Sequence, residues 1–153
     1  IRIFPKAKFI FSLRNPYDCV LSCFMQDFLL NDAMANFINI NDTAVLYNEI
    51  MKLWHQYISL FQVQNHTIKY EELVSDFEKN VKKVLYFLNL DWSESINKYQ
   101  ETAKKRVLIS TPSYNQVTQP IYKESVNRWK KYENKLENIK PMIDPWVKKF
   151  NYK

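Results

Sequence analysis

The sequence predicts an α/β fold in which a parallel β-sheet is flanked by helices, with a helix-rich C-terminal part. Two short apolar and aromatic segments, at residues 8–13 and 66–70, have the composition of strands. Longer segments with apolar residues three and four positions apart follow each of them, which indicates amphipathic helices. The alternation of strand and helix favours a layered α/β structure, of which this chain forms a part.

The first strand is predicted at Lys8–Leu13 and the first helix directly after it. Asn15 is a favourable N-cap, and Pro16 fits the first turn of a helix because its missing N–H has no partner there anyway. The helix is expected to continue to about Leu30, since apolar side chains repeat along one face: Val20, Leu21, Phe24 and Phe28.

The middle of the chain predicts two further helices around a second strand. Capping residues at 41–43 begin a long amphipathic helix that is expected to end near residue 64. The β-branched and aromatic segment His66–Tyr70 reads as the strand, and residues 71–73 connect it to a helix at Phe77–Leu88. Asn89 is expected to cap the end of that helix.

The C-terminal part is predicted to be helical around one loop. A helix is expected from Trp92 to about Lys105, and the polar, aperiodic residues 107–119 form the loop. Three short helices are expected after it, at Glu124–Tyr132, Glu133–Lys140 and Pro145–Phe150.

Composition narrows the classes of function. The 153 residues include no glycine, so a glycine-rich phosphate-binding loop cannot lie in this chain, and Asn89 and Asn127 are expected at backbone positions that usually take glycine. The net charge of +6 suits an anionic ligand but is equally the result of a lysine-rich background. We interpret Cys19 and Cys23 as buried thiols in a reducing compartment, and predict a cytoplasmic protein with no metal and no membrane partner.

The end of the first strand carries the residues most suited to bind an anion. Ligands of open α/β sheets bind beyond the carboxyl ends of the strands, and Arg14 lies at that place with a planar fork of donors for phosphate oxygens. Ser22, two turns into the helix, offers a hydroxyl. From spacing alone, a surface charge at Arg14 and a neutral helix residue at Ser22 are equally good readings.

Three stretches decide between these readings. Residues 7–24 (A-K-F-I-F-S-L-R-N-P-Y-D-C-V-L-S-C-F) resemble the 3'-phosphate-binding strand, turn and helix of the PAPS-dependent sulfotransferases, where PAPS is 3'-phosphoadenylyl sulfate. Residues 69–92 look like the family's Y-E-x-L strand end and following helix, and residues 113–132 like the C-terminal loop of the tyrosylprotein and bacterial TPR-containing types. The resemblance covers nearly the whole chain.

The resemblance implies part of a three-layer, P-loop-NTPase-like fold and an enzyme that transfers a sulfuryl group from PAPS to a hydroxyl acceptor. By position, Arg14 and Ser22 bind the 3'-phosphate and Tyr70 lies along the nucleotide. Further cofactor contacts are implied along the C-terminal loop, at Ser113, Gln116, Val117, Tyr122 and Arg128. The acceptor would be a peptide, a carbohydrate or a small alcohol.

On this interpretation, residues 1–153 are the C-terminal part of one sulfotransferase domain. In the family the 5'-phosphosulfate loop and the catalytic base precede the matching segment, so no catalytic residue is expected here and the chain by itself should be inactive. His55 and His66 match no catalytic motif, and Glu71 and Glu72 read as solvated. The alternatives are a P-loop kinase-like enzyme and, less favoured, a basic nucleic-acid-binding module.

Overall fold

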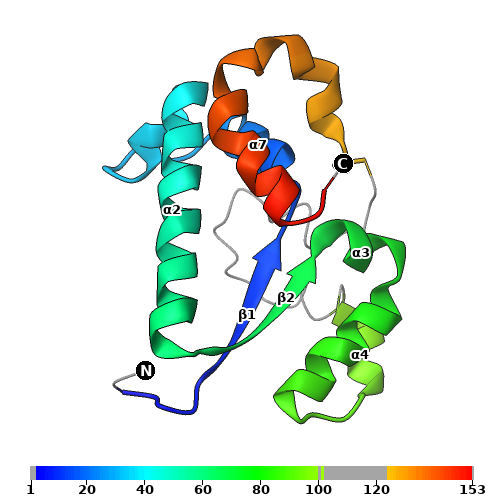
Figure 1. Ribbon diagram of the computed structural model, residues 1–153. Helices are drawn as coiled ribbons and strands as arrows, with labels where there is room; N and C mark the ends of the chain where they lie inside the picture. The colour runs from blue at the N-terminus through cyan, green and yellow to red at the C-terminus, as the bar shows by residue number, and fades with distance from the viewer. Residues whose placement is uncertain (1–2, 100, 102–123, 153) are drawn as a thin grey trace.

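The computed structural model describes residues 3–99, 101 and 124–152. In this part of the chain, two parallel strands form the sheet, and helices flank it (Figure 1). The long helix α2 lies on the β1 side, α3 and α4 on the β2 side, and α7 lies beyond the carboxyl ends of both strands. This arrangement confirms the predicted α/β class and is consistent with part of the three-layer fold that the resemblance implied.

The two strands are β1, Lys8–Leu13, and β2, Gln64–Lys69. They pair in parallel from Lys8 opposite Gln64 to Leu13 opposite Lys69, so both end at the same edge of the sheet. The predicted bounds of β1 are confirmed. The second strand begins earlier than predicted, and it ends at Lys69 because Tyr70 already belongs to the next helix.

Helix α1, Pro16–Phe24, begins where predicted but ends six residues before Leu30. Its start is fixed by Asn15, whose Oδ1 accepts the backbone N–H groups of Tyr17 at 3.0 Å and Asp18 at 3.4 Å. The apolar pattern beyond residue 24 does not continue the helix: Leu30 is exposed, and a separate 3₁₀ turn, η1, follows at Met34–Phe37.

The long predicted helix is α2, Ile40–Phe61. It is capped by Asn39 instead of residues 41–43, and it ends at Gln62, whose left-handed backbone (φ 46°) stops the helix before residue 64. Thr43 is buried, and its hydroxyl donates to backbone carbonyls of the preceding turn.

Two helices follow β2. The predicted connection at 71–73 is a short helix, α3, Tyr70–Ser75, and α4 spans the predicted Phe77–Leu88. Asn89 adopts the left-handed conformation (φ 61°), and its N–H bonds to carbonyls in the last turn of α4. Asparagine tolerates this conformation better than most residues, which explains the cap in a chain without glycine.

In the described residues, the C-terminal elements differ from the prediction in type and in bounds, since the predicted break after Tyr132 lies inside a 3₁₀ helix and the last helix begins at Lys140 instead of Pro145. They are the 3₁₀ helices η2, Glu94–Lys98, η3, Arg128–Lys135, and η4, Glu137–Ile139, and the helix α7, Lys140–Lys149, which contains Pro145. The predicted loop at 107–119 lies outside the described residues. None of the helices in the described ranges combines the length and apolar character needed to cross a membrane.

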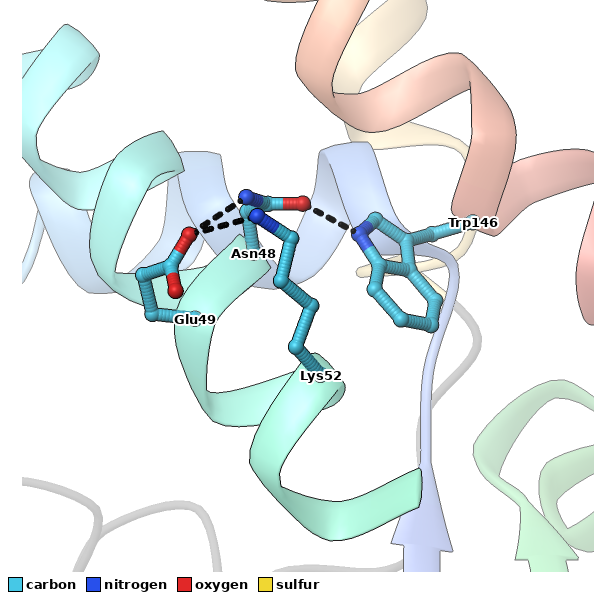
Figure 2. A network of polar contacts seen from close by, with 4 residues as sticks. All are labelled: Asn48, Glu49, Lys52 and Trp146. Carbon is cyan, nitrogen blue, oxygen red and sulfur yellow. Dashed lines mark hydrogen bonds and ion pairs between the residues drawn. The ribbon is translucent and has the colours of Figure 1, made fainter. Parts of the chain in front are cut away.

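The core lies between α1, α2, η4 and α7. Its most buried apolar side chains include Val20, Ala44, Ile139 and Ile143, each at most 1% exposed. Figure 2 shows how α7 is attached to α2 at the rim of this core: the Trp146 indole N–H donates to the Asn48 side chain at 2.9 Å. The core therefore holds in place the helices that lie at the carboxyl edge of the sheet.

Candidate functional site

Arg14 and Tyr70 meet at the carboxyl edge of the sheet. Each directly follows the last paired residue of its strand, Leu13 in β1 and Lys69 in β2. The Arg14 guanidinium carbon lies 5.3 Å from the centre of the Tyr70 ring. A guanidinium over an aromatic face is held electrostatically by the ring, so the parallel register alone brings two of the predicted site residues together.

Only some of the hydrogen-bond donors of the Arg14 guanidinium have partners among the described residues. Nη2 donates to the backbone carbonyl of Ser125 at 2.6 Å. Nε is buried and has no hydrogen-bond partner among the described residues. Buried donors in native proteins are nearly always paired, so this N–H is one whose partner the described residues do not supply.

Glu71 joins the turn after β1 to the end of the chain. Its carboxylate accepts the backbone N–H of Asn15 at 2.8 Å and the Tyr152 hydroxyl at 2.7 Å. The interpretation of Glu71 as a solvated residue was therefore wrong, whereas Glu72 is exposed as expected. Burial first, and then the bond to Glu71, raise the pKa of Tyr152 above its usual range.

Asp18, in the first turn of α1, holds the C-terminal segment in place. One carboxylate oxygen accepts the backbone N–H of Asn127 and the other that of Trp129, both at 2.8 Å. Asp18 is 1% exposed, and burial raises its pKa, although the two N–H groups and the charge of Arg14 act in the opposite direction. Asn127 is left-handed (φ 59°), as its predicted glycine-like place requires.

Ser22 lies on the same face of α1 as Asp18 and Cys19, four and three positions before it. The neighbouring Cys23 has a pKa lowered to about 7, first by a hydrogen bond from Cys19 and also by the charge of Arg14.

The predicted contacts of the C-terminal loop are only partly described. Arg128 is exposed at the first position of η3, and Trp129 packs on Tyr17 with ring centres 4.7 Å apart. Four predicted residues lie outside the described ranges: Ser113, Gln116, Val117 and Tyr122. The structure thus brings together Arg14, Tyr70 and the segment 124–129, which is separated from them in sequence.

The two histidines stack on aromatic side chains. His55 of α2 stacks on Trp146 and Phe150, at 5.5 and 5.9 Å between ring centres, and burial lowers its pKa. His66 of β2 stacks on Phe87. Among residues 3–99, 101 and 124–152, no three acidic, histidine or cysteine side chains are placed to hold a metal ion.

Comparison with known proteins decides the family. Residues 1–94 match the family model described as "Sulfotransferase family", which is more than half of the chain. The chain belongs to the sulfotransferase family. The matched residues include β1, α1 and β2, and therefore Arg14, Ser22 and Tyr70, while the segment that contains Ser125 and Arg128 lies beyond the match.

Individual relatives of this sulfotransferase chain are distant. A protein-tyrosine sulfotransferase of Drosophila melanogaster is 26% identical over 84% of the chain, and protein-tyrosine sulfotransferase 1 of Danio rerio is 25% identical over 84%. An uncharacterized protein of Aquifex aeolicus is 29% identical over 99%. The chain spans 26%, 37% and 21% of these three relatives, so each is much longer than the sequence described here.

Proposed function

We propose that the protein transfers a sulfuryl group from PAPS to a hydroxyl acceptor, and that this chain carries the half of the cofactor site that binds the 3'-phosphate. The observation that carries the proposal is the buried Arg14 Nε, which has no hydrogen-bond partner among the described residues. A phosphate oxygen would complete its hydrogen bonding, and family membership supports PAPS as the ligand that supplies it.

The contacts of Arg14 with its neighbours support this proposal. Tyr70 holds the guanidinium from one side, and the Ser125 carbonyl fixes Nη2, so the remaining donors have a defined direction. Ser22 would add its hydroxyl from the adjoining face of α1, in the role that the family pattern gives it. Arg128, exposed at the start of η3, is available for a second charge contact with the nucleotide.

The role of this part of the protein is then binding and orientation. Sulfuryl transfer, like phosphoryl transfer, depends mainly on the alignment of the attacking and leaving oxygens and on stabilisation of charge, so a firmly held 3'-phosphate fixes the donor for attack. We propose that the chain is the C-terminal part of a single sulfotransferase domain. The remainder of the domain would hold the 5'-phosphosulfate and the base, and this part alone would be inactive.

Protein tyrosine is the acceptor to test first, because two of the distant relatives carry the name protein-tyrosine sulfotransferase. Carbohydrates and small alcohols follow as alternatives.

Cys19 and Cys23 are free thiols, which supports a reducing, cytoplasmic location.

Calorimetric titration of the full-length protein tests the cofactor assignment. Adenosine 3',5'-bisphosphate should bind much more tightly than ADP, which carries no 3'-phosphate. Arg14→Ala should weaken the binding of the bisphosphate by about 2–4 kcal/mol, because it removes a partly buried charge-assisted contact. Lys131→Ala, which removes an exposed cation from η3, is the matched control and should leave affinity almost unchanged. Equal affinity of the wild type for both nucleotides would reject the 3'-phosphate site and favour a kinase-like nucleotide enzyme.

A further inference from the structure

We infer that Asp18 is a positioning residue of the 3'-phosphate site, since it holds the segment 124–129 in the place from which the Ser125 carbonyl directs the Arg14 guanidinium. The inference rests on the proposed function and adds to it a residue that touches neither the cofactor nor the acceptor. It concerns selectivity for the 3'-phosphate.

The first step is the attachment of η3 to α1. The N-cap of η3, Asn127, makes no capping hydrogen bond with its own side chain. Asp18 supplies the acceptors instead, with one carboxylate oxygen on the N–H of Asn127 and the other on that of Trp129. A single buried carboxylate of α1 thus caps a 3₁₀ helix more than a hundred residues away, and both of its oxygens are engaged.

The second step leads from η3 to Arg14. Ser125 lies two residues before Asn127, so fixing the Asn127 amide limits where the Ser125 carbonyl can point. That carbonyl accepts from Arg14 Nη2 at 2.6 Å. The bond, together with the Tyr70 ring at 5.3 Å, determines the plane of the guanidinium and therefore the direction of its unpaired Nε. The contacts form one continuous path from Asp18 to the donor that the phosphate would use.

Three roles of Asp18 predict different results on replacement by Asn. A purely electrostatic role predicts tighter binding of every anion, because a negative charge beside Arg14 is removed. A purely structural role predicts lower stability with unchanged selectivity between nucleotides. The positioning role predicts a selective loss: the amide nitrogen of Asn cannot accept an N–H, so one of the two bonds to η3 breaks and Arg14 loses its alignment.

The experiment compares adenosine 3',5'-bisphosphate with adenosine 5'-monophosphate, which differ only in the 3'-phosphate. Dissociation constants are measured on the full-length wild type and on Asp18→Asn, and their ratio gives the selectivity. We expect the ratio to fall at least tenfold in Asp18→Asn, with the monophosphate affinity nearly unchanged. Asp32→Asn, which alters an exposed carboxylate outside the helices, is the matched control and should retain the wild-type ratio.

An unchanged ratio in a less stable Asp18→Asn protein would overturn the inference, and so would tighter binding of both nucleotides. A wild type that does not distinguish the two nucleotides would instead reject the proposed 3'-phosphate site. If Asp18→Asn does not fold, amide hydrogen exchange on the wild type replaces it. The bisphosphate should slow exchange at Asn127 and Trp129 more than the monophosphate does, because coupling between the two places is reciprocal. Equal exchange with both nucleotides would overturn the inference.

Discussion

Replacing Tyr152 with Phe tests the attachment of the chain's end to the turn after β1. The change removes one hydroxyl that donates to the Glu71 carboxylate at 2.7 Å, and it keeps the ring under the Lys69 ammonium, 4.6 Å from the ring centre. Hydrogen bonds to charged groups contribute about 1.5–3 kcal/mol, and the low end applies because both residues are only half-buried. We expect a loss of about 1.5 kcal/mol at pH 7, or roughly 3–6 °C in Tm.

The loss should depend on pH in a defined direction. The pKa of Tyr152 is raised in the folded protein, so its contribution is fully present below the pKa of about 10 that tyrosine has in the unfolded chain. Above that pH the unfolded state gains by ionising, and the advantage of the wild type over Tyr152→Phe should shrink by about 1.4 kcal/mol per pH unit. The two proteins should therefore be equally stable near pH 11, by the same arithmetic. Tyr17 and Tyr47, whose pKa values are also raised, are common to both proteins and cancel.

Urea denaturation followed by tryptophan fluorescence, at several pH values from 7 to 11, measures this difference. Tyr86→Phe is the control, because Tyr86 is 86% exposed, and should match the wild type at pH 7. A difference between wild type and Tyr152→Phe that stays constant up to pH 11 would contradict the reasoning, as would equal stability at pH 7.

Two further predictions concern α1 and the contact in Figure 2. The rate of Cys23 alkylation by iodoacetamide should be half-maximal near pH 7, because the lowered pKa of this thiol lies there. Bound adenosine 3',5'-bisphosphate should slow the alkylation. A half-maximal rate near the pKa of an ordinary thiol would contradict the influence of Cys19 and Arg14. A double-mutant cycle of Trp146→Phe with Asn48→Ala, measured by urea denaturation, should give a coupling energy of about 1 kcal/mol, because each change removes one partner of the 2.9 Å hydrogen bond. Additive effects of the two changes would show that the bond contributes nothing to stability.

Local features of the structure could be predicted from the sequence because a short stretch determines them. β1 and α4 have the predicted bounds, since each lies between strong local signals: Asn15-Pro16 ends the strand region, and Asn89 stops the helix. The left-handed backbone at Asn89 and Asn127 also follows locally, because a chain without glycine has few residues that accept it. The predicted bounds of β1 were enough to place Arg14 at the end of the strand.

Features that depend on distant residues could not be predicted in the same way. In sequence, Asp18 is an acidic residue in the first turn of a helix, where favourable interaction with the helix dipole already explains it. Its bonds to Asn127 and Trp129, and those of Glu71 to Asn15 and Tyr152, exist only after the chain has folded. The early end of α1 was not predicted either, because Leu29 and Leu30, which continue the apolar pattern, are exposed and Phe28 packs on Phe37 instead.

The absence of glycine also affects the unfolded protein. Glycine gives a denatured chain more conformations than any other residue, and replacing one where the native backbone allows it stabilises a protein by about 0.4–1 kcal/mol. The chain has roughly ten glycines fewer than an average chain of this length. The free-energy cost of the conformational entropy lost on folding is therefore smaller by several kcal/mol. Against this stands a cost of about 1 kcal/mol at each left-handed residue that is not glycine, and Gln62, Asn89, Asn127 and Asn151 are such residues. The stiffness of the denatured chain thus offsets strain that the folded chain carries at its helix ends.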